Sequence, residues 1–270
     1  MKFSICNELF EGWEFERVCA TTKEAGYTGI EIAPFTLAKL ATEVSSAQRE
    51  KIRKTASAAG IEIVGLHWLL AQTEGFHINH PDKTIRDRTV NYLIELTNLC
   101  ADLGGRIMVF GSPKQRNVCE GLTYSQAWEY AVETFRRVVP TLEKCKVTLC
   151  LEPLSPEETD FVNTASEAAK MVQEIGSPSF QLLLDVKAMS SEKTSVPELI
   201  RTYHGILKHF HANDANKRGP GFGSTDFRPI LSALKEIGYT GWVSVEVFDF
   251  TPDPVTIAHK SMEYLISTLN

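Results

Sequence analysis

The sequence predicts an α/β protein that folds as a closed (β/α)8 TIM barrel in a single domain, residues 1–270. Eight short apolar runs alternate with longer amphipathic stretches along the chain, which is typical of a parallel sheet covered by helices. Four of these runs close on a polar residue, and these residues are 33, 26 and 35 positions apart (152 to 185, 185 to 211, 211 to 246). One strand with its return helix takes about 30 residues in such a barrel. The expected strands are 2–6, 28–33, 61–67, 106–110, 147–152, 180–185, 207–211 and 242–247.

Helical patterns fill the spaces between the expected strands, for example at 13–26, 45–60 and 83–105. Several of these patterns close on a glycine just before the next strand, which is the left-handed stop expected where a helix turns back into a sheet. These glycines are Gly26, Gly60, Gly176 and Gly238. The phosphate-binding glycine motifs of dinucleotide-binding and P-loop folds do not occur, and neither does a linker. One barrel domain is therefore expected.

Composition limits the possible partners. The chain is 43% hydrophobic and 23% charged, with a net charge of −6 and no basic cluster, so nucleic acid is not an expected partner. No stretch approaches the roughly 20 apolar residues of a membrane span, and no signal-peptide core is visible near the first residue. A cytoplasmic protein is therefore expected. The six cysteines form no C-x-x-C motif, which favours buried free thiols over a disulfide or zinc framework.

The residues that close four strands are Glu152, Asp185, His211 and Glu246. A charge at the end of a buried strand is costly unless it is paired, and strand-end ion pairs would explain any one of these residues alone. All four together would meet at the carboxyl ends of neighbouring strands. Three carboxylates there would repel one another unless a divalent cation lay among them. Oxygen ligands with one imidazole suit Mn²⁺, or alternatively Mg²⁺ or Co²⁺, whereas zinc would more often recruit further His or Cys.

The segments around these four residues resemble the xylose isomerase-like sugar isomerase/epimerase superfamily, and within it the D-tagatose 3-epimerase and D-psicose 3-epimerase branch. The resemblance is carried by LEP, LLLD, HFHANDANKRGPGFG and WVSVEVF, at 151–153, 182–185, 209–223 and 242–248. It implies a divalent metal, usually manganese, held by the four residues, with Glu152 and Glu246 also acting as the acid/base pair. It further implies that Glu158 holds substrate hydroxyls and that the protein forms dimers or tetramers.

The implied chemistry is consistent with elementary reactivity. A proton next to a ketone is weakly acidic, and a metal that bridges two ketose oxygens stabilises the cis-enediolate formed when the proton leaves. Glu152 and Glu246 could address opposite faces of C3, so that one removes the proton and the other returns it. We therefore expect a metal-dependent ketose or sugar-phosphate isomerase/epimerase. The alternatives are a metal-dependent lyase or dehydratase on a keto-inositol or 3-keto sugar, and a non-catalytic sugar-binding barrel.

Two positions depart from the epimerase pattern. The family has a histidine three residues after the metal-binding aspartate, where this chain has Ala188, and an arginine six residues after the metal-binding histidine, where it has Lys217. Lys217 keeps the positive charge but not the planar fork that binds oxygens in pairs. Lys187 could replace the missing histidine, although a solvated loop lysine is the favoured interpretation. The sequence therefore leaves the identity of the sugar open.

Other residues near the strand ends are candidates for the wall of the site. His67 could contact substrate or be a hydrogen-bonded structural histidine. Trp68 and Phe248 could form apolar walls against a sugar ring, although core packing is the favoured interpretation for each. Glu31 could face the ligand or form an ion pair. His209 lies two residues before His211 on the same strand face, and we expect it one layer deeper as a structural neighbour.

Overall fold

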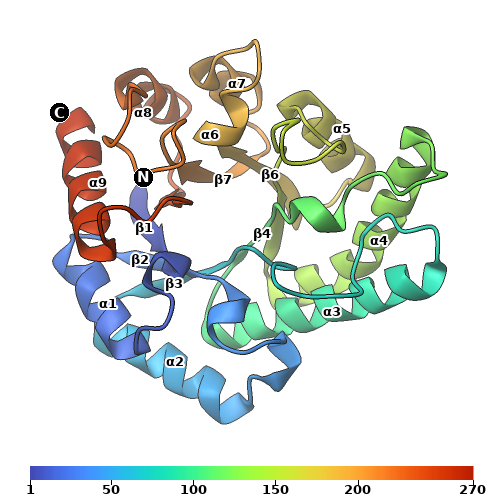
Figure 1. Ribbon diagram of the computed structural model, residues 1–270, viewed down its shortest axis with the longest axis horizontal. Helices are drawn as coiled ribbons and strands as arrows, with labels where there is room; N and C mark the ends of the chain where they lie inside the picture. Colours follow the sequence, from blue (N-terminus) through green and yellow to red (C-terminus); the bar gives the residue numbers. More distant parts are fainter. Residues whose placement is uncertain (270) are drawn as a thin grey trace.

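The computed structural model describes residues 1–269, which form a closed barrel of eight parallel strands in sequence order. Figure 1 shows the strands at the centre and the helices around them. The predicted fold and all eight predicted strands are confirmed, with ends that differ by only a few residues. The strands are β1 (Lys2–Cys6), β2 (Gly29–Ile32), β3 (Glu62–Leu66), β4 (Ile107–Phe110), β5 (Thr148–Leu151), β6 (Phe180–Asp185), β7 (Leu207–Ala212) and β8 (Trp242–Val245).

The outer layer consists of helices whose ends follow the capping signals in the sequence. Ser45, Thr123 and Thr164 cap the first turn of α2, α4 and α5 through their hydroxyls. The predicted stops at Gly26, Gly60, Gly176 and Gly238 all have positive φ. The helices are α1 (Phe15–Glu24), α2 (Ser46–Ala58), α3 (Lys83–Leu103), α4 (Tyr124–Cys145), α5 (Ala165–Ile175), α6 (Val186–Met189), α7 (Val196–Thr202), α8 (Phe227–Glu236) and α9 (Pro254–Leu269).

One glycine allows the close approach of β3 and β4. A Cβ atom at Gly65 would lie 1.8 Å from the carbonyl oxygen of Ile107, with which Gly65 is in register. Only a residue without a side chain fits there, so the chain can pair these strands and still deliver His67 and Trp68 to the carboxyl end of the barrel. The loops at this end are longer than those at the other end, as barrels that carry an active site require.

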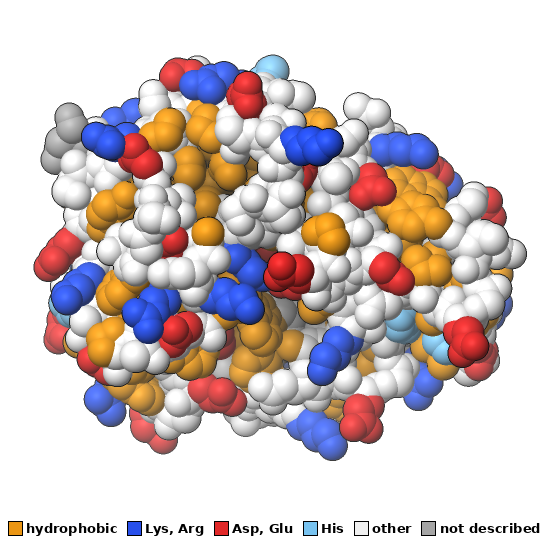
Figure 2. Space-filling model, turned by 45° about the horizontal axis from the view of Figure 1, so that its top comes forward, with side chains coloured by type: hydrophobic (Ala, Val, Ile, Leu, Met, Phe, Trp, Pro, Cys, Tyr) orange, Lys and Arg blue, Asp and Glu red, His pale blue; other side chains and the backbone are white. Residues whose placement is uncertain are grey.

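Two further expectations concern cysteines and charge. All six cysteines are free, and Cys6, Cys19, Cys100 and Cys150 are buried, which confirms the expected thiols. Basic and acidic side chains are interspersed over the face drawn in Figure 2, which has a hollow near its centre. Among residues 1–269, none of the helices combines the length and apolar character needed to cross a bilayer.

Candidate metal centre and active site

The four strand-end residues meet at the carboxyl end of the barrel. Glu152 and Glu246 directly follow β5 and β8, while Asp185 ends β6 and His211 lies in β7. One ligand atom of each lies within 4.8 Å of all the others, and all four side chains are buried. The sequence spacing therefore predicted this convergence correctly. We call these four residues the metal quartet.

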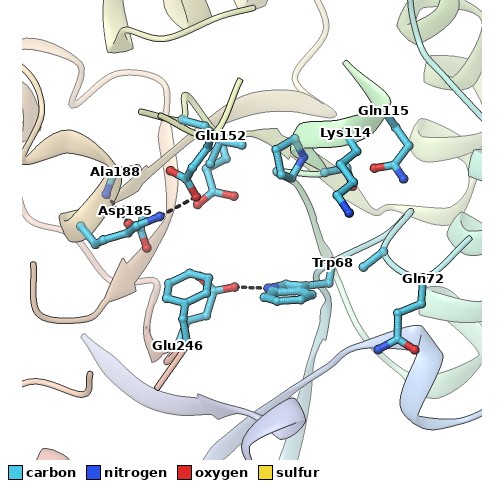
Figure 3. Close-up of a pocket in the computed structure, with 16 residues that line it drawn as sticks. Trp68, Gln72, Lys114, Gln115, Glu152, Asp185, Ala188 and Glu246 are labelled. Carbon is cyan, nitrogen blue, oxygen red and sulfur yellow. Dashed lines mark hydrogen bonds and ion pairs between the residues drawn. The ribbon is translucent and has the colours of Figure 1, made fainter. Parts of the chain in front are cut away.

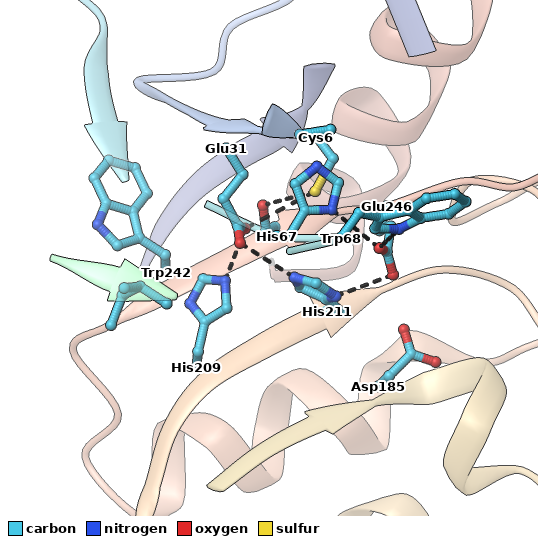
Figure 4. Close-up of polar contacts among 12 residues, drawn as sticks. Cys6, Glu31, His67, Trp68, Asp185, His209, His211, Trp242 and Glu246 are labelled. Carbon is cyan, nitrogen blue, oxygen red and sulfur yellow. Dashed lines mark hydrogen bonds and ion pairs between the residues drawn. The ribbon is translucent and has the colours of Figure 1, made fainter. Parts of the chain in front are cut away.

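Glu246 is fixed by three donors from two other strands. Its Oε1 accepts a hydrogen bond from Trp68 Nε1 at 2.7 Å and lies 3.2 Å from His67 Nδ1, and its Oε2 lies 3.0 Å from His211 Nδ1 (Figure 4). Burial alone would raise the pKa of this carboxyl, but the neighbouring His211 and His67 outweigh burial and lower it. Glu246 is therefore held as an oriented carboxylate.

Glu152 has a contrasting environment. Among the described residues its carboxylate accepts no hydrogen bond, and only its backbone carbonyl is held, by Arg116 Nη1 at 2.8 Å. Burial, followed by the like charges of Glu246 and Asp185, raises its pKa well above the ordinary value. The two environments therefore shift the pKa values of Glu152 and Glu246 in opposite directions, as expected of an acid and base pair.

Asp185 is positioned by the loop that follows it. Its Oδ1 caps α6 by accepting from Ala188 N at 2.7 Å, and its Oδ2 accepts from Asn213 Nδ2. Burial and the charge of Glu246 nevertheless raise its pKa to about 6. Glu152 and Asp185 crowd against the carboxylate of Glu246. With the imidazole of His211 they form a donor set that fits a hard or borderline divalent cation. The four side chains present therefore fit the metal that the sequence implied.

His211 is oriented by a carboxylate behind it. Its Nε2 lies 3.4 Å from Glu31 Oε1, which leaves Nδ1 facing the quartet, and Glu31 Oε2 also bonds to His209 Nε2 at 2.8 Å. A carboxylate behind a metal-binding imidazole sets its tautomer and its ring orientation. Of the two interpretations of Glu31, ion pairing is the one observed, and His209 is fully buried beside His211 as expected.

A cavity of about 340 Å³ lies over the quartet. Glu152, Asp185 and Glu246 reach it (Figure 3), and its wall includes the predicted residues Trp68, Glu158 and Phe248. The rings of Trp68 and Phe248 stack at 6.0 Å with 28° between their planes. This pair therefore forms a flat apolar surface on the cavity wall, and the favoured interpretation of core packing was wrong.

Lys187 belongs to the cavity wall, which corrects the expectation of a solvated lysine. Its Nζ forms an ion pair with Glu158 Oε1 and lies 4.8 Å above the centre of the Phe248 ring, and its side chain is only 12% exposed. The adjacent Ala188 also lines the cavity. An ammonium group therefore reaches the cavity from the position next to Ala188.

Two predicted substrate-binding residues are not part of the described cavity wall. His67 is fully buried between Glu246 and Glu8, so the structural alternative is the one observed. Lys217 has φ +71, and its carbonyl oxygen accepts from the backbone of Phe248 and Asp249. Through this carbonyl Lys217 braces the loop after β8, and its side chain does not line the described cavity.

Several residues of the site were missed at the sequence level. Glu8 follows β1 by two positions, so the strand-end rule could have found it. Arg116 is fully buried in the loop after β4, where nothing in its neighbours indicates burial. The cavity wall also includes Gln72, Lys114 and Gln115. These three lie in long polar loops, in which sequence alone does not show which side chains turn inward.

The closed barrel, with three carboxylates and an imidazole buried at the carboxyl ends of its strands, has the features of a TIM-barrel protein with a metal site. Residues 19–268 match the family described as "Xylose isomerase-like TIM barrel", and the chain belongs to this family.

Relatives of the chain are epimerases. An L-ribulose 3-epimerase of Mesorhizobium japonicum is 30% identical over 239 residues, which is 87% of this chain and 76% of that protein. A D-psicose 3-epimerase of Ruminiclostridium cellulolyticum is 36% identical over 121 residues, which is 45% of this chain and 41% of that protein. A solved L-ribulose 3-epimerase, 24% identical, superimposes with a TM-score of 0.87 and covers 100% of this chain and 95% of its own. The chain is thus an enzyme of the epimerase branch.

Proposed function

We propose that the protein is a divalent-metal-dependent epimerase that inverts C3 of a ketose or a ketose derivative. The observation that carries this proposal is the pair of glutamates that reach the same cavity from β5 and β8, one held by Trp68 and His67 and the other by no side chain of the described residues (Figure 3). A site that only binds sugar would need no such difference. Manganese suits the donor set best, with magnesium and cobalt as alternatives.

The residues divide the work of inversion between them. Glu246, held as an oriented carboxylate, accepts the proton from C3, and Glu152 returns a proton on the opposite face. The reverse reaction exchanges the two roles. When bound, a divalent cation would supply Lewis-acid polarisation of the ketone next to C3. Trp68 and Phe248 would hold the ring, and Glu158 with Lys187 would hold its hydroxyl oxygens.

Proton exchange with solvent tests this function directly. We expect the protein loaded with Mn²⁺ to incorporate deuterium at C3 of at least one member of a panel of ketoses, ketose phosphates and 3-keto glycosides, with formation of the C3 epimer. The measurement is NMR in deuterium oxide, and a chelator is expected to stop the exchange. Exchange that leads to an unsaturated carbonyl product would instead support the lyase alternative, while binding without exchange would support a sugar-binding barrel.

Lys187 is expected to hold the substrate rather than move protons. Lys187→Met removes the ammonium group from the wall, and a hydrogen bond to a charged group contributes about 1.5–3 kcal/mol. We therefore expect KM to rise about 10- to 100-fold with a smaller change in kcat, and Lys187→Arg to restore part of the loss. Steady-state kinetics measures both constants, and the exposed Lys193→Met serves as the control. An unchanged KM in Lys187→Met would contradict this role.

The dimeric or tetrameric assembly that the resemblance implies stays a prediction. The described structure is of one chain, and sedimentation of the purified protein would measure the assembly.

A further inference from the structure

A second group of metal-binding side chains lies beside the quartet. Cys6 ends β1, Glu8 lies in the short 3-10 helix η1 (Asn7–Phe10) and His67 follows β3. One donor atom of each lies within 4.8 Å of the other two, and all three residues are buried. Figure 4 shows Cys6 next to His67, on whose other side Glu246 lies. The proposed epimerase chemistry makes no direct use of Cys6 or Glu8.

Three buried polar atoms in this group have no hydrogen-bond partner in the described structure. They are both carboxylate oxygens of Glu8 and Nε2 of His67. His67 Nε2 and Glu8 Oε2 are 3.0 Å apart, but their orientation does not satisfy hydrogen-bond geometry. Buried polar groups are rarely left without a partner because desolvation is costly. With Nδ1 of His67 directed at Glu246, a cation between His67 Nε2 and the Glu8 carboxylate would satisfy both groups.

The buried charges call for positive charge in this region. The carboxyl end of the barrel buries five carboxylates: Glu8, Glu31, Glu152, Asp185 and Glu246. One divalent ion in the quartet and the buried Arg116 together offset only three of these charges. Either a second cation or a proton on His67 would reduce the remaining negative charge.

We propose that Cys6, Glu8 and His67 form a second metal site, distinct from the quartet and selective for zinc. A thiolate, an imidazole and a carboxylate are ligands typical of Zn²⁺, whereas the quartet contains no sulfur. Zinc holds sulfur at about 2.3 Å and imidazole nitrogen at about 2.0–2.1 Å, so side-chain shifts from the present separations, all within 4.8 Å, would complete the site. Zinc would displace the Cys6 proton, whose present contacts are distant, at 3.9 Å to Glu31 Oε2 and 3.6 Å to Ser244 Oγ.

This site would act as a positioning device for Glu246. A metal on His67 Nε2 fixes the proton on Nδ1, and that proton is donated to Glu246 Oε1. Residues that orient metal-bound groups in this way commonly affect activity by about 10- to 100-fold. The inference does not depend on which sugar is the substrate.

Cobalt spectroscopy of the whole protein distinguishes this site from the quartet. After chelation and reloading with Co²⁺, we expect a sulfur-to-cobalt charge-transfer band, because only the second site contains a thiolate. Elemental analysis of zinc-loaded protein should show a second metal equivalent per chain. Cys6→Ser should abolish the band and the second equivalent, whereas Cys150→Ser, which alters another buried strand cysteine, should keep both.

Two further variants separate this inference from the proposed function. Asp185→Asn weakens the quartet and should leave the sulfur-to-cobalt band in place, while Glu8→Gln should weaken the band and spare the quartet. Absence of the band in the wild-type protein with a filled quartet would overturn the second site, and would assign the charge balance to a protonated His67. Since this result comes from the unmodified chain, poor folding of Cys6→Ser cannot obscure it.

Discussion

Glu152→Gln and Glu246→Gln are each expected to lower kcat for C3 inversion by about 10²- to 10⁴-fold, the usual contribution of a general acid or base. Glutamine keeps the shape of the side chain but cannot carry the proton. The two variants should differ in the epimer whose C3 proton they still exchange, because each glutamate acts on one face of C3. Glu152→Gln should still exchange the C3 proton of one epimer with solvent, and Glu246→Gln that of the other.

The measurement is C3 deuterium incorporation started from each epimer separately, alongside kcat. Glu157→Gln provides a matched control, since it changes an exposed glutamate in the loop that follows Glu152. Glu246→Gln has a further cost, because its amide group would face three donors from Trp68, His67 and His211. Full inversion by either variant would show that the two glutamates are not an acid/base pair.

Arg116→Met is expected to destabilise the fold by about 1–3 kcal/mol, the cost of leaving a buried carbonyl without its partner. Arg116 is fully buried, and its guanidinium donates to the carbonyls of Glu152 and Phe110, both at 2.8 Å. The Phe110 carbonyl keeps the backbone N–H of Glu152 at 3.1 Å, so the Glu152 carbonyl is the one left unpaired. The backbone that presents Glu152 to the quartet would lose its support at the same time.

Urea unfolding monitored by circular dichroism measures this loss, and the exposed neighbour Lys114→Met is the control for stability. Metal affinity of the folded variant should also fall, since Glu152 is a quartet member. A loss of stability below about 1 kcal/mol would contradict the bracing role of Arg116, because even one unpaired buried carbonyl costs that much.

The parts of the fold that follow from local chemistry could be predicted from the sequence. Strands, helix stops and the quartet are encoded within short segments, by apolar runs, by glycines and by acids at strand ends. Arg116 and Lys187 could not be placed in this way. Arg116 lies in the loop after β4 and Lys187 in the short helix α6 directly after β6, and the burial of each depends on segments distant in the sequence. A lysine that pairs with Glu158 therefore has the same local sequence as a lysine in solvent.

His67 and Lys217 show a second limit. A position in a motif fixes where the backbone passes, but not which way the side chain turns. His67 turns inward because Glu8 and Glu246 both attract its imidazole, and Lys217 adopts a left-handed backbone that bonds to the loop after β8. Such choices are made between segments far apart in the chain, which a motif does not contain.

The contacts around Glu246 also bear on how the protein is assembled. Trp68 and His67 lie 178 and 179 positions before Glu246 in the sequence, and Glu31 lies 180 positions before His211, which it contacts. Contacts of such high sequence separation form late, because the intervening chain must be ordered first. No half-barrel fragment would hold a complete acid/base pair with its supporting donors. The complete acid/base pair with its supporting donors should therefore form only when β8 pairs with β1 and closes the barrel.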